Sequence, residues 1–178
     1  MIRPHGRFVD CTFAAHGEQI CEIFNDAILT STALYDYEPR QIEQVGRWFE
    51  TKAQLSLPVL GIEGDDGELK AFGSYGPFRN FPAYKYTAEH SIYVARPYRG
   101  GGLGRAILEA LIARAHQDEL HALVGAIDAE NRASCVLHER LGFKRVGTLP
   151  QVGFKFGRWL DLAVYQLLLE TPAKPVDG

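Results

Sequence analysis

A glycine-rich turn between a strand and a helix is the part of the sequence best suited to chemistry. The alternating segment Ser91–Val94 predicts a strand, and an amphipathic helix begins at Leu103. Three consecutive glycines occupy positions 100–102, and Gly104 lies in the first helical turn. A helix that starts this way leaves backbone N–H groups unpaired at the positive end of its dipole. These groups predict a site for a phosphate or pyrophosphate.

The spacing of the glycines discriminates between several phosphate-binding folds. A P-loop requires Lys and then Ser or Thr after its last glycine, whereas Arg105 follows Gly104. The dinucleotide fingerprint requires a small residue where Arg105 stands, and its acidic residue ends the next strand, whereas Asp118 precedes that strand. The pattern that fits is R-x-x-G-x-G, formed by Arg99, Gly102 and Gly104. A flexible turn without a ligand is the alternative interpretation.

The composition is that of one globular domain without a nucleic-acid or membrane partner. The chain has 178 residues, of which 46% are hydrophobic and 23% charged, so it can bury a core of its own. A net charge of -3 does not favour nucleic acid, and no apolar run approaches membrane-spanning length. The first ten residues lack the apolar core of a signal peptide. Cys11, Cys21 and Cys135 are scattered, which is typical of reduced thiols, and we expect a cytoplasmic location.

Periodicity predicts a single mixed α/β domain over residues 1–170, with a frayed tail at 171–178. Helices are predicted at 18–32, between Pro39 and Pro58, at 103–117, and at 132–141 with Gly142 as a C-cap. Strands are predicted at 7–14, 59–63, 69–75, 86–94, 122–127, 144–149 and 159–169. The resulting order is β-α-α-β-β-β-α-β-α-β-β, with the glycine-rich turn between the fourth strand and the third helix.

The residues around this turn resemble a known family. The chain is similar to the GCN5-related N-acetyltransferases, whose loop for the pyrophosphate of acetyl-coenzyme A has the R-x-x-G-x-G pattern and whose element order is the one above. The segments AEHSIYV, GAIDAENRAS, LHERLGF and VGFKFGRWLDLAVYQL resemble the phosphinothricin and methionine sulfoximine acetyltransferases, over residues 72–170. The resemblance implies a homodimer and an α/β sheet in which the strand ending at Val94 splays from the strand Ala122–Ile127.

Acetyl transfer to an amine requires a neutral nucleophile, a polarised thioester and a proton for the departing thiolate. Glu89, on the strand before the turn, is the candidate base, and the resemblance places it at the general-base position; a solvated strand face is the alternative. His90 points to the opposite face, where we expect a packed or hydrogen-bonded histidine. His138 stands where many relatives have a tyrosine general acid, so it either donates a proton or packs against the cofactor.

The same resemblance assigns residues to acetyl-coenzyme A. Backbone N–H groups of Tyr93 and Val94 would polarise the thioester carbonyl. Asn131 would bind the pantetheine or phosphate portion, and it also has the position of a helix N-cap, with Ser134 one turn further on. The loop and the start of the helix complete the cofactor-binding set: Arg99, Gly100, Gly101, Gly102, Leu103, Gly104 and Arg105.

The substrate implied by the resemblance is a small amino-acid-like amine. Arg79 is the first candidate to bind its carboxylate and Lys155 the second. Tyr35, Phe81 and Trp159 would wall the pocket. Solvated loop residues, core contacts or dimer contacts are the alternative roles for these side chains.

Two other functions remain open. A protein N-terminal or lysine acetyltransferase would need an open groove, and a non-catalytic acyl-coenzyme A sensor would need no base, against which Glu89 argues. A metal site is not expected, because Cys135 and His138 form a lone pair at i, i+3. No G-x-S-x-G segment indicates a hydrolase. Acetyl-coenzyme A is therefore the expected co-substrate.

Overall fold

The computed structural model describes residues 6–177, which fold as two compact units. The first unit comprises residues 6–75 and 91–111, and the second comprises residues 76–90 and 112–177. Residues 1–5 of the predicted domain and residue 178 of the predicted tail lie outside the described residues. Within the described residues, no helix has the length and apolar character needed to cross a membrane.

The elements follow one another in the predicted order. The helices are α1 (Phe13–Thr30), α2 (Ile42–Gln54), α3 (Leu103–Gln117) and α4 (Arg132–Arg140), with 3-10 turns η1 (Pro82–Tyr84) and η2 (Arg96–Tyr98). The strands are β1 (Arg7–Asp10), β2 (Val59–Glu63), β3 (Leu69–Pro77), β4 (Thr87–Val94), β5 (Ala122–Asp128), β6 (Lys144–Lys155) and β7 (Arg158–Leu168). The seven strands form one sheet in the order β1-β2-β3-β4-β5-β7-β6. The predicted α/β fold class and element order are therefore confirmed.

Several predicted boundaries differ from those in the structure. β1 ends at Asp10, short of the predicted residue 14, and the two other large differences have local reasons. α1 begins at Phe13, earlier than the predicted residue 18, because the hydroxyl of Thr12 caps it by accepting from the Ala15 N–H at 3.3 Å. β6 continues beyond the predicted residue 149, because its pairing with β7 resumes after an irregularity between Leu149 and Gly153. That irregularity interrupts the alternation from which the strand was predicted.

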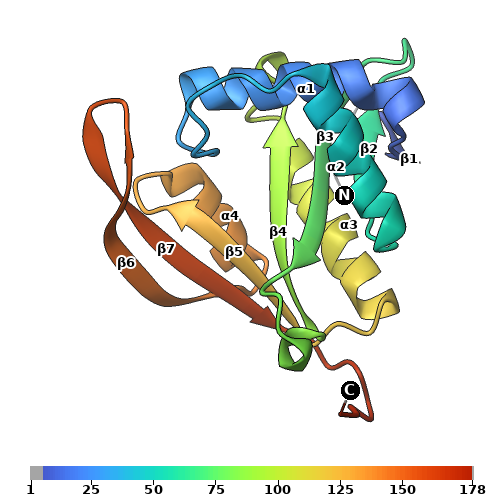
Figure 1. The fold of residues 1–178 in the computed structure, drawn as a ribbon, viewed down its shortest axis with the longest axis vertical. Coiled ribbons are helices and arrows are strands. Elements are labelled where there is room, and N and C mark those ends of the chain that lie inside the picture. The colour runs from blue at the N-terminus through green and yellow to red at the C-terminus, as the bar shows by residue number, and fades with distance from the viewer. Residues whose placement is uncertain (1–5, 178) are drawn as a thin grey trace. The chain divides into compact units, whose positions relative to one another are not determined.

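An aromatic core holds the first unit together. Figure 1 shows α2 crossing in front of β2 and β3, and buried side chains of α1, α2, β2 and β3 form one cluster. Within it the ring of Phe24 lies 5.1 Å from the rings of Phe72 and Tyr93, and Phe72 and Tyr93 stack at 5.2 Å. Since Tyr93 is the penultimate residue of β4, this core fixes the backbone at the start of the glycine-rich turn.

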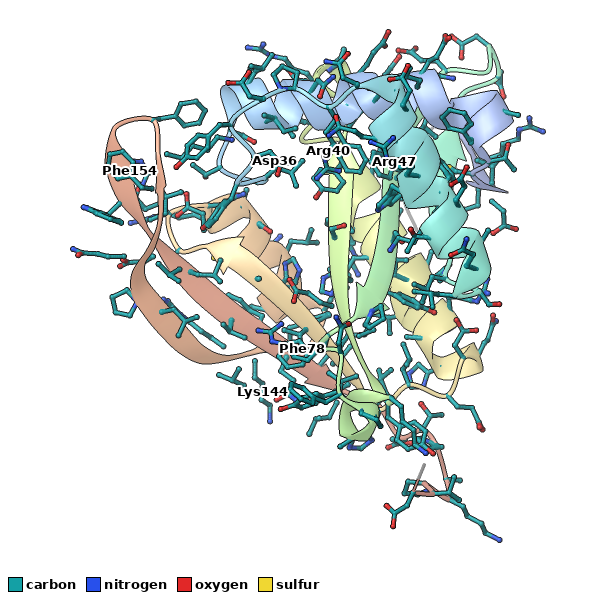
Figure 2. All side chains as sticks on the ribbon, viewed as in Figure 1. Asp36, Arg40, Arg47, Phe78, Lys144 and Phe154 are labelled. Carbon is teal, nitrogen blue, oxygen red and sulfur yellow. The ribbon has the colours of Figure 1, made fainter. Side chains whose placement is uncertain are left out.

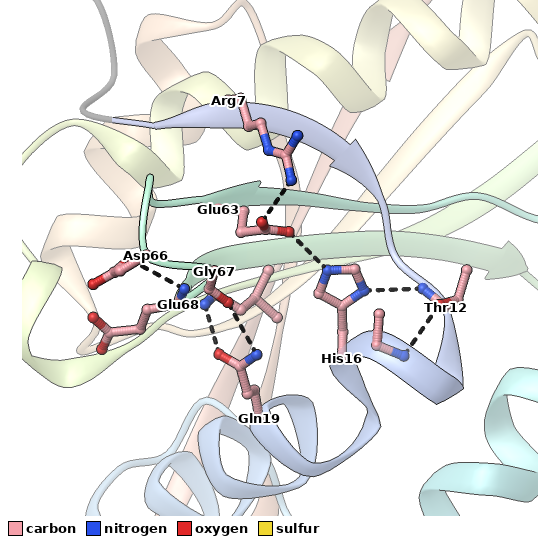
Figure 3. A network of polar contacts seen from close by, with 10 residues as sticks. Arg7, Thr12, His16, Gln19, Glu63, Asp66, Gly67 and Glu68 are labelled. Atoms are coloured by element: carbon pink, nitrogen blue, oxygen red, sulfur yellow. Dashed lines mark hydrogen bonds and ion pairs between the residues drawn. The ribbon is translucent and has the colours of Figure 1, made fainter.

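A polar network ties the strands at the edge of the first unit to α1 (Figure 3). His16 Nδ1 accepts from the Thr12 N–H at 3.1 Å, so the ring proton is on Nε2, which donates to Glu63 Oε2 at 3.1 Å. Arg7 Nη2 donates to the other oxygen of Glu63 at 2.8 Å. The hydrogen bonds from Arg7 and His16 lower the pKa of Glu63. The carboxylate thus joins β1, β2 and the first turn of α1.

The second unit is built on the start of β4 and on β5, β7 and β6. Residues 87–89 of β4 pair in parallel with residues 122–124 of β5, and β7 pairs antiparallel with both β5 and β6. Figure 1 shows β6 and β7 as a long twisted hairpin, with α4 beside β5. The segment predicted to fray makes hydrogen bonds here: His121 Nδ1 lies 3.0 Å from Thr171 O, and the Val176 N–H donates to Tyr86 Oη at 3.1 Å.

Candidate active site

The glycine-rich turn adopts the backbone conformation that its sequence requires. Gly100 and Gly102 have φ of +82° and +86°, a region that favours glycine. A Cβ at either position would meet no atom within 4 Å, so backbone conformation and not crowding explains these two glycines. The Ala106 N–H donates to Gly102 O at 3.1 Å, and the three residues between them precede the first helical hydrogen bond of α3. Their N–H groups are suited to a phosphate.

The side chain of Arg99 joins this turn to α1 and to the end of β4. Its Nη2 donates to Asp26 Oδ2 at 2.6 Å, and its Nε donates to Val94 O at 3.1 Å. Arg96 Nη1 lies 3.9 Å from the other oxygen of Asp26. Arg105, on the first turn of α3, pairs with Glu109 at 2.8 Å. Arg99 therefore has an anchoring role inside the first unit, whatever it contributes to a phosphate.

Two further predicted residues lie in the first unit. The ring of Tyr93 is buried in the aromatic core, so its predicted contribution to the cofactor rests on its backbone alone. Tyr35 is partly exposed in the segment between α1 and α2. Beside it, Asp36 and Arg40 form an ion pair at 2.8 Å (Figure 2), and Arg40 covers the ring of Phe24 at 4.3 Å. The segment that carries Tyr35 is thus attached to the core.

The second unit places the candidate base beside a cation. Glu89 Oε2 lies 3.9 Å from Arg79 Nη1, and both side chains are partly exposed. Burial raises the pKa of Glu89, and the positive charge of Arg79 opposes this shift. Arg79 is itself held in place: it donates to Phe78 O at 2.7 Å and covers the Phe78 ring at 4.2 Å. A carboxylate of raised pKa is suited to take a proton near neutrality.

The start of α4 holds the other predicted polar residues. Asn131 is the N-cap, since its side chain accepts from the Ser134 N–H at 3.2 Å. One turn further, His138 Nδ1 lies 2.7 Å from Ser134 O. His138 is buried, and burial lowers its pKa, which the Ser134 carbonyl opposes. The predicted N-cap is therefore confirmed, and His138 is a buried residue of the same helix.

The remaining substrate candidates differ in exposure. Lys155 is buried, with Nζ 5.0 Å from the Phe156 ring. Phe81 is 69% and Trp159 59% exposed. The ring of Trp159 meets that of Phe154 edge-on at 5.1 Å on the β6–β7 hairpin. In residues 6–177, no group of three or more His, Cys, Asp or Glu side chains could hold a metal ion.

Comparison with known proteins identifies the family. The model of the acetyltransferase (GNAT) family matches residues 19–143, which is more than half of the chain. The chain belongs to the GNAT acetyltransferase family. It is therefore an enzyme, an N-acetyltransferase.

The chain is similar to several acetyltransferases. An L-methionine sulfoximine/L-methionine sulfone acetyltransferase of Pseudomonas aeruginosa is 45% identical over 85% of this chain and 88% of its own length. The structure of a putative acetyltransferase of Acinetobacter baylyi matches 97% of this chain and 96% of its own, with a TM-score of 0.95 and 54% identity. A GNAT phosphinothricin acetyltransferase of Sinorhizobium meliloti, solved with acetyl-coenzyme A, covers 98% of this chain and 95% of its own, with a TM-score of 0.92 and 30% identity.

The predicted site residues of this GNAT enzyme divide between the two units. The first unit holds Tyr35, the end of β4, the glycine-rich turn and the start of α3, with the residues Tyr93, Val94, Arg99, Gly100, Gly101, Gly102, Leu103, Gly104 and Arg105. The second unit brings Arg79 to Glu89, joins Asn131 and Ser134 to His138, and holds Phe81, Lys155 and Trp159.

Sequence reasoning missed the partners of two of these candidate residues. Asp26 binds Arg99 from 73 positions away, and His90 Nε2 lies 2.9 Å from His138 Nε2 across 48 positions. Alternation along β4 correctly placed His90 on a buried face. No local pattern names a tertiary partner, so both pairs needed the structure.

Proposed function

We propose that the enzyme transfers the acetyl group of acetyl-coenzyme A to the α-amine of a small amino-acid-like substrate of the methionine sulfoximine, methionine sulfone or phosphinothricin type. The observation that carries the proposal is the Glu89–Arg79 pair, in a chain that shares 45% identity with a methionine sulfoximine/methionine sulfone acetyltransferase. The pair supplies a base and a cation, which an amino acid requires because it carries an ammonium and a carboxylate.

Glu89 is proposed as the general base. An α-ammonium has no lone pair, so a proton must leave before nitrogen can attack the thioester carbon. The carboxylate takes this proton directly or through water, and burial of Glu89 makes the transfer easier by raising its pKa. The N–C bond then forms, the nitrogen loses its second proton to water, and the C–S bond breaks. Coenzyme A leaves as its thiolate and takes a proton from the solvent.

Arg79 is proposed to bind the substrate carboxylate. Its guanidinium is fixed by the Phe78 carbonyl and ring but still partly exposed, so it can accept a second anionic partner. Its distance of 3.9 Å from Glu89 suits a substrate whose amine and carboxylate are on one carbon. Lys155 is less suited to this role because its side chain is buried.

The cofactor proposal rests on the turn before α3. We assign the pyrophosphate of acetyl-coenzyme A to the N–H groups that begin α3, and the thioester carbonyl to the N–H of Val94. Asn131 is proposed to bind the pantetheine portion. The positive φ of Gly100 and Gly102 supports this assignment, and so does the solved phosphinothricin acetyltransferase with acetyl-coenzyme A. The splay between β4 and β5 stays a prediction.

Transfer is proposed to be direct, without an acyl-enzyme. A cysteine acts as a nucleophile only as its thiolate, and burial raises the pKa of Cys11 to about 12 and raises that of Cys21. The three cysteines form no disulfide, which supports a cytoplasmic location.

One assay tests the proposal against its two alternatives. Release of the coenzyme A thiol is followed with methionine sulfoximine, phosphinothricin, methionine and a lysine peptide offered separately. Turnover with the first two compounds is expected. Preference for the peptide would indicate a protein acetyltransferase, and coenzyme A binding without any turnover would indicate a sensor.

A homodimer is proposed from the surface of the β6–β7 hairpin. Seven large apolar side chains there are 46% to 63% exposed: Val146, Leu149, Val152, Phe154, Phe156, Trp159 and Leu168. β5 pairs with residues 162–168 of β7, so residues 158–160 of β7 extend beyond this pairing and pair with β6 on their other side. Phe154 lies near its end (Figure 2). Exposed apolar patches of this kind are typical of interfaces.

Light scattering of the purified chain tests this assembly. We expect twice the mass of one chain, and Phe154→Glu together with Trp159→Glu should shift the mass toward that of one chain. Leu29→Glu, at an exposed apolar position of α1, is the matched control. A monomeric wild-type chain at micromolar concentration would contradict the dimer.

A further inference from the structure

Two histidines form a buried hydrogen-bonded pair in the second unit. His90 on β4 is 6% exposed and His138 on α4 is 3% exposed. Their Nε2 atoms are 2.9 Å apart, and their rings are nearly parallel with centroids separated by 5.1 Å. The ring of Phe143 packs against both, at 5.2 Å and 5.1 Å. A Cβ on Gly125 of β5 would lie 3.0 Å from His90 and 3.2 Å from His138, so glycine at this position makes room for the pair.

The neighbours of His138 determine where its proton lies. Nδ1 is 2.7 Å from the carbonyl oxygen of Ser134, which can only accept, so Nδ1 carries the hydrogen. A neutral imidazole has one N–H, and Nε2 of His138 is therefore an acceptor. The short contact between the Nε2 atoms then requires His90 to donate. This leaves Nδ1 of His90 without a hydrogen, and it is a buried atom without a hydrogen-bond partner.

The surroundings keep both rings neutral. Burial, together with the neighbouring His138, lowers the pKa of His90 to about 3, and the backbone of Val124 on β5 opposes this shift. Burial also lowers the pKa of His138. Tyr165 of β7 faces the pair with its ring 6.0 Å from that of His138, and its hydroxyl donates to Glu139 of α4 at 2.9 Å. On β4, the neighbouring Glu89 points to the opposite face.

We infer that His90 is a positioning residue, which donates its ring N–H to Nε2 of His138 and so prevents His138 from protonating the departing thiolate. Both nitrogens of His138 are engaged within the protein, one by Ser134 and one by His90. The pair attaches β4 to α4 next to Glu89, and it thereby orients the proposed base. The kinetic part of this inference rests on the proposed function, whereas the proton positions do not.

Nitrogen-15 NMR of the wild-type chain tests the proton positions without any substrate. Two-bond couplings in histidine rings distinguish a proton on Nδ1 from one on Nε2. We expect His138 as the Nδ1–H form and His90 as the Nε2–H form, both neutral at pH 6. The exposed His116 supplies the reference signal. A proton on Nε2 of His138, or a cationic pair that shares a proton between the two Nε2 atoms, would overturn the inference.

Matched substitutions of His90 test the positioning role. His90→Gln keeps an N–H donor near the position of Nε2, whereas His90→Met has a similar volume and no donor. We expect His90→Gln to retain kcat within about threefold, and His90→Met to lower kcat about tenfold while the KM for acetyl-coenzyme A changes little. Equal loss in both variants would contradict the positioning role.

The alkaline side of the kcat profile separates positioning from acid catalysis at His138. For His138→Gln we expect a lower kcat with the same dependence on pH above neutrality as in the wild type. If His138 were the general acid, the wild-type kcat would fall with rising pH as His138 loses its proton. The variant would then lack this fall, and its kcat would be about 10²- to 10⁴-fold lower. If no amine is acetylated at all, the proposed function fails, whereas the NMR result still decides the proton positions.

Discussion

Arg99 donates one hydrogen bond to Asp26 Oδ2 at 2.6 Å and another to Val94 O at 3.1 Å. The arginine that opens the R-x-x-G-x-G pattern is therefore anchored to α1 and to the last residue of β4. An anchored arginine holds the turn in one conformation before a cofactor arrives, and it reduces the entropy that binding would otherwise cost.

Asp26→Asn should weaken this anchor. We expect the Kd for coenzyme A to rise roughly two- to fivefold, the effect of a partly exposed charged pair, with kcat unchanged. Isothermal titration measures the affinity. Asp36→Asn removes a similar ion pair with Arg40 in the same unit and serves as the control. Tighter binding by Asp26→Asn would show that Asp26 competes with the pyrophosphate and does not support the turn.

Glu89→Gln should remove the proposed base and leave the rest of the chain intact. We expect kcat to fall about 10²- to 10⁴-fold, with little change in affinity for acetyl-coenzyme A. Steady-state kinetics across pH 6 to 9 would measure this. Glu170→Gln, at an exposed position, provides the control. Wild-type turnover by the Glu89 variant would exclude Glu89 from the mechanism.

Arg79→Gln should change both substrate affinity and pH dependence. The KM for the amino-acid substrate should rise roughly tenfold or more, because a charge-assisted hydrogen bond is lost. Arg79 lowers the pKa of Glu89, so its removal raises that pKa further. A base acts when deprotonated, and the acidic limb of kcat/KM therefore moves to higher pH. Arg145→Gln is the control. A shift of the acidic limb to lower pH in Arg79→Gln would contradict the pairing of Arg79 with Glu89.

Gly102→Val should disturb both backbone conformation and cofactor binding. The position has φ of +86°, which costs a residue with a Cβ about 1–2 kcal/mol. Gly67→Val is a matched control, since Gly67 has φ of +82° and similarly open surroundings in another turn of the same unit. Both variants should lose thermal stability, and only Gly102→Val should lose coenzyme A affinity. Unchanged affinity would refute the pyrophosphate assignment.

Glu63→Gln should alter stability in acid. The pKa of Glu63 is lowered in the fold by Arg7 and His16, so its stabilising contribution is present above the pKa of the unfolded chain. That contribution is lost as the pH falls through the folded pKa, below about 4.5. Urea unfolding should show the variant less stable than the wild type at pH 7, with a smaller difference at pH 3.5. Glu50→Gln is the control. If the stability difference between wild type and Glu63→Gln were the same at pH 7 and pH 3.5, the proposed role of the network would be contradicted.

Local patterns in the sequence predict most of the fold and part of the site. The start of α3 at Leu103, the glycine-rich turn before it, and the N-cap at Asn131 all follow from residues close in sequence. Alternation also predicts that His90 faces the interior, because a strand changes face at every residue.

Tertiary pairing could not be predicted in the same way. Asp26 on its own indicates only a polar position of an amphipathic helix, and nothing near it points to Arg99. The continuation of β6 beyond residue 149 could not be predicted either, because the positive φ of Gln151 interrupts the alternation of side chains along the strand. Sequence periodicity reports which face a residue occupies, whereas its partner depends on how separate elements pack.

Gly125 limits the space available to both histidines of the pair. An alanine there would place its Cβ within 3.0–3.2 Å of both imidazoles, and such contact requires one ring to move or to be replaced by a smaller side chain. We therefore expect relatives that lack glycine at this position also to lack one of the two histidines. A designer who wants to install or remove the histidine pair must begin on β5, at a residue with no side chain.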